Sequence, residues 1–114
     1  MSDINRIPGP SRGRSRAVEY NGFVWVVGVG AGGSVAEQTR NTLALIEGAL
    51  EKAGSGKDRI LEATVYLTDM ATKEEMDAVW CDWLPEDGWP CRACVGAELA
   101  EDHRVEIKLI AAKK

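Results

Sequence analysis

Residues 17–27 read Ala-Val-Glu-Tyr-Asn-Gly-Phe-Val-Trp-Val-Val, and the fold can be worked out from this stretch outward. Two runs rich in β-branched and aromatic residues flank Asn21-Gly22, the pair that best tolerates the two positive φ angles of a type I′ turn. The stretch therefore predicts a β-hairpin. Its second strand, Phe23 to Val27, is apolar throughout, which indicates that both of its faces are covered. A central place in a sheet or a contact between subunits would cover them.

A helix and a strand are expected after the hairpin. Ser34-Val-Ala-Glu37 has the form of a capping box, in which the Ser and Glu side chains each bond the other residue's backbone amide. Residues at helical spacing then continue to Ala53, and Gly54 supplies the stop. Residues 60–69 alternate between apolar and polar, which predicts a strand with one apolar face made of Leu61, Ala63, Val65 and Leu67.

The C-terminal half repeats this pattern. Thr72-Lys-Glu-Glu75 reads as a second capping box, and it opens a helix with an apolar stripe that Pro85 ends. Residues 92–99 and 104–112 read as two last strands around a polar turn. Residues 1–16 have no periodicity and read as an irregular arm. The order ββαβαββ predicts one α+β domain over residues 1–114, with hairpins, both helices on one face of a sheet, and the other face left for a partner.

Composition narrows the class of protein. The 114 residues are 45% hydrophobic, as in one globular domain, and the formal charge of −4 argues against general nucleic-acid binding, because phosphate affinity depends on Lys and Arg. We find no apolar run of roughly 18 residues and no signal-peptide region. Three cysteines, an odd number, fit a reducing compartment. We therefore expect a cytoplasmic protein that binds no membrane.

Two motifs that suggest a cofactor fail on their context. Residues 28–33 match G-x-G-x-x-G, but Glu51, at the distance of the required acidic residue, still lies in the helical pattern. Cys91 and Cys94 form a C-x-x-C in a strand-like setting, and only Cys81 and His103 remain as further zinc ligands. We therefore expect no cofactor and no metal, and a glycine loop that is flexible or approaches a ligand.

Two charged residues lie within the apolar segments of the last strands. They are Arg92 and Glu106. A buried charge without a partner costs several kcal/mol, so Arg92 must either form an ion pair or bind an anion. A structural ion pair between Arg92 and Glu106 and an anion-binding site are both open on this argument. Alternation places Cys94 on the same face as Arg92.

These segments carry a family resemblance. Trp89-Pro-Cys-Arg-Ala-Cys-Val95, Leu99 and Val105-Glu-Ile-Lys-Leu-Ile-Ala111 resemble the C-terminal signature of the RidA (YjgF/YER057c/UK114) family, also called L-PSP-type endoribonucleases. With residues 37–43 and 61–69, which are similar to its first helix and following strand, the resemblance covers about residues 14–112. It implies a chorismate-mutase-like homotrimer with an inner barrel of sheets and three clefts between subunits. It also implies cofactor-free hydrolysis of enamine and imine acids, such as 2-aminoacrylate and 2-iminobutanoate, to 2-keto acids and ammonia.

The resemblance also implies roles for single residues. Arg92 matches the arginine that holds the substrate carboxylate, and Glu106 matches the acid that positions or activates water. Cys94 matches a pocket-lining cysteine, and Gly28 a strand-end glycine whose backbone meets the ligand. Arg14 occurs where many members have Tyr, as in a divergent short subgroup, and would add positive charge to the cleft.

Two other functions remain open at this stage. The first is a non-catalytic trimer that binds small carboxylates or a protein partner in the same clefts. The second is an endoribonuclease for single-stranded RNA, which the net acidity and the single histidine disfavour.

Overall fold

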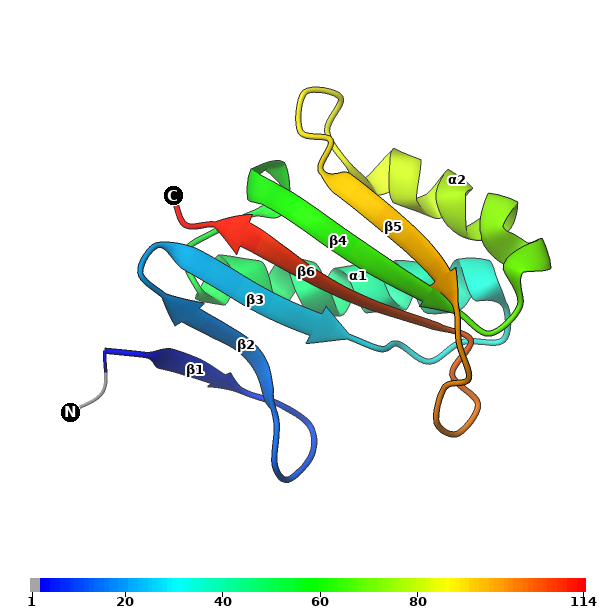
Figure 1. Ribbon diagram of the computed structural model, residues 1–114, viewed down its shortest axis with the longest axis horizontal. Coiled ribbons are helices and arrows are strands. Elements are labelled where there is room, and N and C mark those ends of the chain that lie inside the picture. Colours follow the sequence, from blue (N-terminus) through cyan, green and yellow to red (C-terminus); the bar gives the residue numbers. More distant parts are fainter. Residues whose placement is uncertain (1–2) are drawn as a thin grey trace.

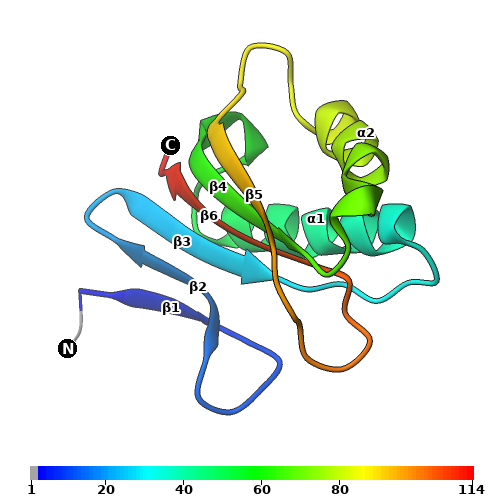
Figure 2. The same ribbon diagram turned by 45° about the vertical axis from the view of Figure 1, so that its right-hand side comes forward.

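The computed structural model describes residues 3–114, which form one sheet with two helices on one of its faces (Figures 1 and 2). This arrangement confirms the predicted α+β class. The strands in chain order are β1 (Asn5–Pro8), β2 (Ser15–Tyr20), β3 (Phe23–Gly28), β4 (Ile60–Leu67), β5 (Cys91–Gly96) and β6 (Val105–Ala112). The helices are α1 (Val35–Lys52) and α2 (Lys73–Trp83), and the short 3-10 helices η1 (Lys57–Arg59) and η2 (Met70–Thr72) precede β4 and α2. Neither α-helix of this part of the chain is long and apolar enough to cross a membrane.

The predicted hairpin is confirmed as β2 and β3. Asn21 and Gly22 have φ angles of 54° and 86°, as a type I′ turn requires. Within the chain, however, the helices cover only one face of β3. Val24 and Val26 are buried beneath them, whereas Phe23 and Trp25 are exposed on the face that carries no helix. The expectation that both faces are covered is therefore not met by the single chain.

The prediction of an irregular arm over residues 1–16 is wrong in part, because residues 5–8 and 15–16 are in strands, whereas residues 9–14 are irregular. Residues 5–8 form β1, which pairs antiparallel with β2 through Asn5 opposite Glu19 and Ile7 opposite Ala17. Residues 1–2 lie outside the described part of the chain. A short edge strand is held by backbone hydrogen bonds on one side only, so it needs no apolar periodicity and leaves no pattern to detect.

The expected C-terminal hairpin is also wrong. The sheet order is β1-β2-β3-β6-β4-β5, so β4 lies between β5 and β6. β6 runs antiparallel to both of its neighbours, and β5 runs parallel to β4 after the crossover through α2. β6 lies inside the sheet, where α1 covers it. Its residues Val105, Ile107 and Leu109 are almost completely buried, so β6 contributes strongly to the stability of the core.

The two capping boxes differ from their expected form. Ser34 Oγ accepts from Glu37 N at 3.1 Å, but the Glu37 carboxylate accepts from Gly33 N and not from Ser34. Thr72 caps no helix, because η2 holds it at ψ 7° instead of the extended conformation of an N-cap. Glu75 Oε2 accepts from Ala36 N at 2.8 Å, so this residue of α2 caps the start of α1.

A register shift explains one misplaced apolar residue. Ala63, Val65 and Leu67 are buried as predicted, but Leu61 is 45% exposed and Ile60 is buried in its place. The pairing of β4 with β6 is irregular between Ile60 and Glu62. A bulge of this kind reverses the alternation of side chains along a strand.

Candidate functional site

A groove at the ends of β2 and β3 brings together three of the five predicted site residues. Arg14 precedes β2, Gly28 ends β3, and Glu106 is the second residue of β6. They line one groove with a volume of about 450 Å³, and the turn before β6 adds Glu101 and His103. The structure thus joins residues from distant parts of the sequence at one edge of the sheet.

Gly28 is required by the packing of α1. A Cβ atom built on Gly28 would lie 2.8 Å from Cγ1 of Ile46, so any side chain there would push helix and strand apart. The next glycine of the run, Gly30, donates its backbone N–H to Thr42 Oγ1 at 2.8 Å. Close approach of α1 therefore explains these glycines, and Gly28 also borders the groove.

Glu106 is the unpaired acid of the groove. Its side chain is half-buried and has neither an ion pair nor a hydrogen bond within residues 3–114. Arg14 is exposed and likewise unpaired in this part of the chain. Arg16 donates to the carbonyl of Val27 at 3.0 Å, and His103 Nε2 lies 3.4 Å from Glu101. Glu106 is thus a carboxylate whose oxygens are free to accept protons from water or a ligand in the groove.

Arg92 lies elsewhere, as the second residue of β5, and its side chain contacts α2. Its Nη2 is 2.8 Å from Asp77 Oδ1, and its guanidinium lies 5.4 Å from the centre of the Trp80 ring. The sequence left two interpretations of Arg92 open, an ion pair with Glu106 and an anion-binding site. The ion pair with Glu106 is wrong within one chain, because Arg92 pairs with Asp77 instead. Burial raises the pKa of Asp77, but the hydrogen bond from Lys73 and the charges of Arg92 and Lys73 outweigh it and leave this pKa below its ordinary value.

A second cavity, of about 320 Å³, borders Arg92 and Asp77. Its other walls are mostly apolar and include Trp80, Leu84 and Trp89. Cys94, two residues further along β5, is half-buried, and burial raises the pKa of its thiol more than the nearby Arg92 lowers it. Cys94 is not among the residues that line this cavity, and its pocket-lining role stays a prediction. Sequence reasoning missed Asp77, whose only signal was an acidic residue between Met76 and Trp80 on the apolar side of a helix.

Arg92 and Glu106 face opposite sides of the sheet. Arg92 is opposite Ala63, which is buried beneath the helices. Glu106 is opposite Tyr66, and side chains three residues apart along β4 point to opposite faces. One chain therefore does not bring these two charges together.

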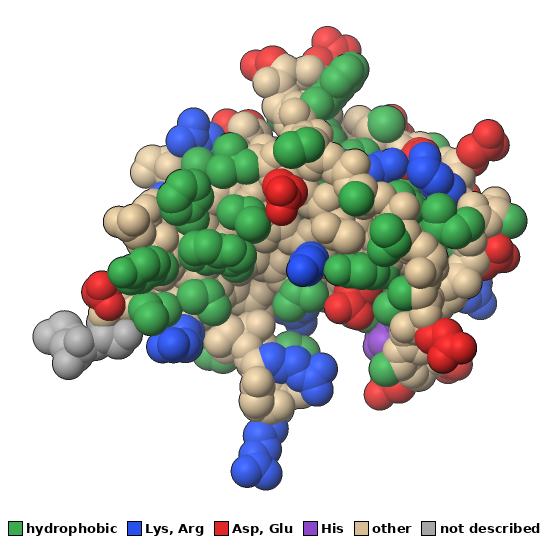
Figure 3. All heavy atoms as spheres, in the orientation of Figure 1, with side chains coloured by type: hydrophobic (Ala, Val, Ile, Leu, Met, Phe, Trp, Pro, Cys, Tyr) green, Lys and Arg blue, Asp and Glu red, His purple; other side chains and the backbone are tan. Residues whose placement is uncertain are grey.

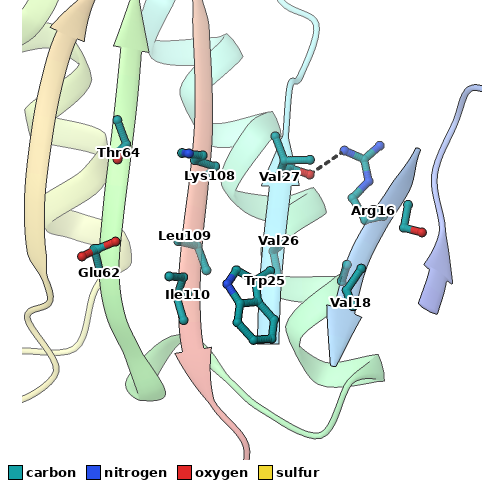
Figure 4. A pocket seen from close by; sticks show the side chains of 12 residues that line it. Arg16, Val18, Trp25, Val26, Val27, Glu62, Thr64, Lys108, Leu109 and Ile110 are labelled. Carbon is teal, nitrogen blue, oxygen red and sulfur yellow. Dashed lines mark hydrogen bonds between the residues drawn. The ribbon is translucent and has the colours of Figure 1, made fainter. Parts of the chain in front are cut away.

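The face without helices carries an apolar patch. Tyr20, Phe23 and Trp25 are all more than 40% exposed there. Figure 3 shows hydrophobic side chains gathered over β2, β3 and β6. In Figure 4, Trp25 and Ile110 border a shallow pocket of about 360 Å³, with Glu62 and Lys108 further along it. A contiguous apolar patch of this kind marks an interaction surface.

These features define a small α+β protein with a charged groove and an apolar face open to a partner. The family model described as Endoribonuclease L-PSP matches residues 5–113. The RutC family protein YoaB of Escherichia coli strain K12 is 39% identical over 101 residues, which are 86% of this chain and 89% of that protein. The chain therefore belongs to the RutC/YjgF family of L-PSP-type proteins.

Solved structures agree with this assignment. A YjgF family member from Neisseria meningitidis is 41% identical, with a TM-score of 0.92 over 98% of this chain and 96% of that one. A member of the YjgF/YER057c/UK114 family from Mycobacterium tuberculosis is 29% identical, with a TM-score of 0.88 over 96% of this chain and 98% of that one.

Proposed function

We propose that this protein is a cytoplasmic, cofactor-free deaminase that hydrolyses enamine and imine acids, of the 2-aminoacrylate and 2-iminobutanoate type, to 2-keto acids and ammonia. The observation that carries the proposal is the unpaired Glu106 carboxylate in a groove beside the Gly28 backbone. A carboxylate in this setting can take a proton from water. Family membership supports the reaction class, and the carboxylate of the substrate matches the guanidinium of Arg92.

In this reaction one group acts first as a general base and then as a general acid. Glu106 takes a proton from a water molecule, and the resulting hydroxide adds to the carbon of the C=N bond. The protonated Glu106 then returns this proton to the nitrogen, which gives a neutral carbinolamine. Glu106 next takes the proton of the added hydroxyl as the carbonyl forms and passes it to the nitrogen as the C–N bond breaks. Ammonia leaves with its protons, water supplies the keto oxygen, and Glu106 regains its starting state. No electron transfer occurs, so the step needs no redox cofactor.

The active site is completed by a second copy of the chain. Arg92 and Glu106 face opposite sides of one sheet, so a cleft that uses both takes them from two subunits. The exposed Phe23 and Trp25 supply an apolar surface for such contacts. A homotrimer with the helix-free faces turned inward buries this surface and repeats the cleft three times by its symmetry.

The rate of keto-acid formation tests the deaminase. An amino-acid oxidase generates 2-iminobutanoate in the assay, and the protein accelerates its hydrolysis above the spontaneous rate. Arg92→Ala raises KM, and Glu106→Gln lowers kcat by about a hundredfold or more, because a general base contributes this much. Glu86→Gln, at an exposed position of the connector before β5, is the matched control. No acceleration by the wild type refutes catalysis and leaves carboxylate binding in the clefts as the function.

Arg14 is proposed to assist binding. It is unpaired and lines the groove beside Glu106, so it attracts an anionic substrate. Arg14→Ala is expected to raise KM a few-fold and to leave kcat unchanged. If the wild type and Arg14→Ala have equal KM values, Arg14 does not contribute to substrate binding.

A further inference from the structure

Arg92 shares its counter-ion with a second cation. Asp77 Oδ1 lies 2.8 Å from Arg92 Nη2, and Asp77 Oδ2 lies 2.7 Å from Lys73 Nζ. One carboxylate therefore sits between two positive groups, and the three side chains together carry one net positive charge. The Trp80 ring, 5.4 Å from the guanidinium, holds Arg92 from another side. This cluster is preorganised and is not neutral.

The contact with Asp77 leaves hydrogen-bond donors on Arg92. Asp77 Oδ1 is at ion-pair distance, yet it accepts no directed hydrogen bond from any described residue. Nη1 of Arg92 has only the weak acceptor Met76 Sδ, at 3.9 Å. Arg92 and Asp77 also border the same cavity, so an anion that binds Arg92 there lies close to the Asp77 charge.

We propose that Asp77 is a specificity-determining residue that makes the Arg92 site select ligands with one carboxylate over ligands with two; this inference rests on the proposed function. One carboxylate balances the single net positive charge of the cluster. A second carboxylate would find no further cation there and would be repelled by Asp77. At separations of several ångström near a protein surface, one such repulsion changes affinity by about tenfold.

The groove at Glu106 does not offset this selection. Arg14 and Arg16 line it together with Glu101 and Glu106, so its fixed charges balance. Once Arg14 attracts the first carboxylate of a ligand, Glu101 and Glu106 leave no net attraction on that side of the cleft for a second one.

The test compares two keto acids that share a head group. Dissociation constants of 2-oxobutanoate and 2-oxoglutarate are measured by calorimetry on the wild type and on single variants. Asp77→Asn keeps the shape of the side chain and removes its charge, so we expect the ratio of the two constants to shift about tenfold toward the dianion. Lys73→Met removes a cation, and the ratio shifts in the opposite direction. Added salt at 0.5 M reduces both shifts, because it screens charges near the surface.

The control is Asp82→Asn, the same chemical change at an exposed position of α2. It is expected to leave the ratio unchanged. The side chain of Lys73 is 42% exposed, so Lys73→Met is expected to fold. This variant therefore tests the proposal even if Asp77→Asn does not fold.

Two outcomes separate this inference from the deaminase proposal. If Arg92→Ala loses both keto acids while Asp77→Asn and Lys73→Met leave the ratio unchanged, the role of Asp77 is overturned and the carboxylate site at Arg92 stands. If Arg92→Ala binds both keto acids as the wild type does, the site is not at Arg92, and both proposals are overturned.

Discussion

Mixing two inactive variants tests the proposed site at the level of its subunits. The two charges face opposite sides of the sheet, so Arg92 of one copy is expected to act with Glu106 of the next. A trimer that contains Arg92→Ala and Glu106→Gln subunits then regains a complete cleft wherever an Arg92 from one variant meets a Glu106 from the other. The two variants complement each other only if the cleft is shared.

The expected recovery follows from the symmetry. In a cyclic trimer assembled at random from equal amounts of the two variants, each residue of a cleft is intact with a chance of about one half, so about a quarter of the clefts are complete. Co-expressed variants are expected to hydrolyse 2-iminobutanoate at about a quarter of the wild-type rate. The control is the same two proteins assembled separately and mixed only in the assay. If native mass spectrometry shows mixed trimers that stay inactive, the shared cleft is refuted.

Three further predictions concern the fold around the site. Trp25→Asp places a charge in the exposed apolar patch, so we expect sedimentation to show monomers with an unchanged circular dichroism spectrum; intact trimers would contradict the role of this face. Gly28→Ala forces a contact with Cγ1 of Ile46 and is expected to cost about 1–3 kcal/mol in urea unfolding; an unchanged free energy of unfolding would contradict the tight packing of α1 on β3. Glu75→Ala removes the cap on Ala36 and is expected to cost about 1 kcal/mol; a loss no larger than that of an exposed surface variant would show that the cap is unimportant.

Several elements could be predicted because their signals are local. The turn at Asn21-Gly22 depends on two backbone angles, and the cap at Ser34 depends on a hydroxyl three residues from its donor. The end of α1 is set by Gly54, whose φ of 84° suits a residue without a side chain. Arg92 and Glu106 stand out as candidate site residues for the same reason, since a charge within an apolar segment is visible in the sequence alone.

The failures involve local patterns that tertiary contacts overrode. Thr72 and Glu75 match a capping box, yet η2 turns Thr72 away and Glu75 bonds α1 instead. The strand β1 was missed because backbone pairing at a sheet edge leaves no periodicity. Leu61 was misplaced because a bulge shifts the alternation of β4, and no residue type in that stretch marks it.

The sequence by itself determined the strands and α-helices other than β1, the placement of both helices on one face of the sheet and the two charges of the candidate site, because each depends on residues a few positions apart. Only the tertiary structure decided which side chains lie beside those two charges. Pairing β4 with both β5 and β6 put Arg92 and Glu106 on opposite faces, and packing α2 on the sheet gave Arg92 the partner Asp77. Strand order and helix packing depend on burial summed over the whole core, which no short stretch of sequence contains.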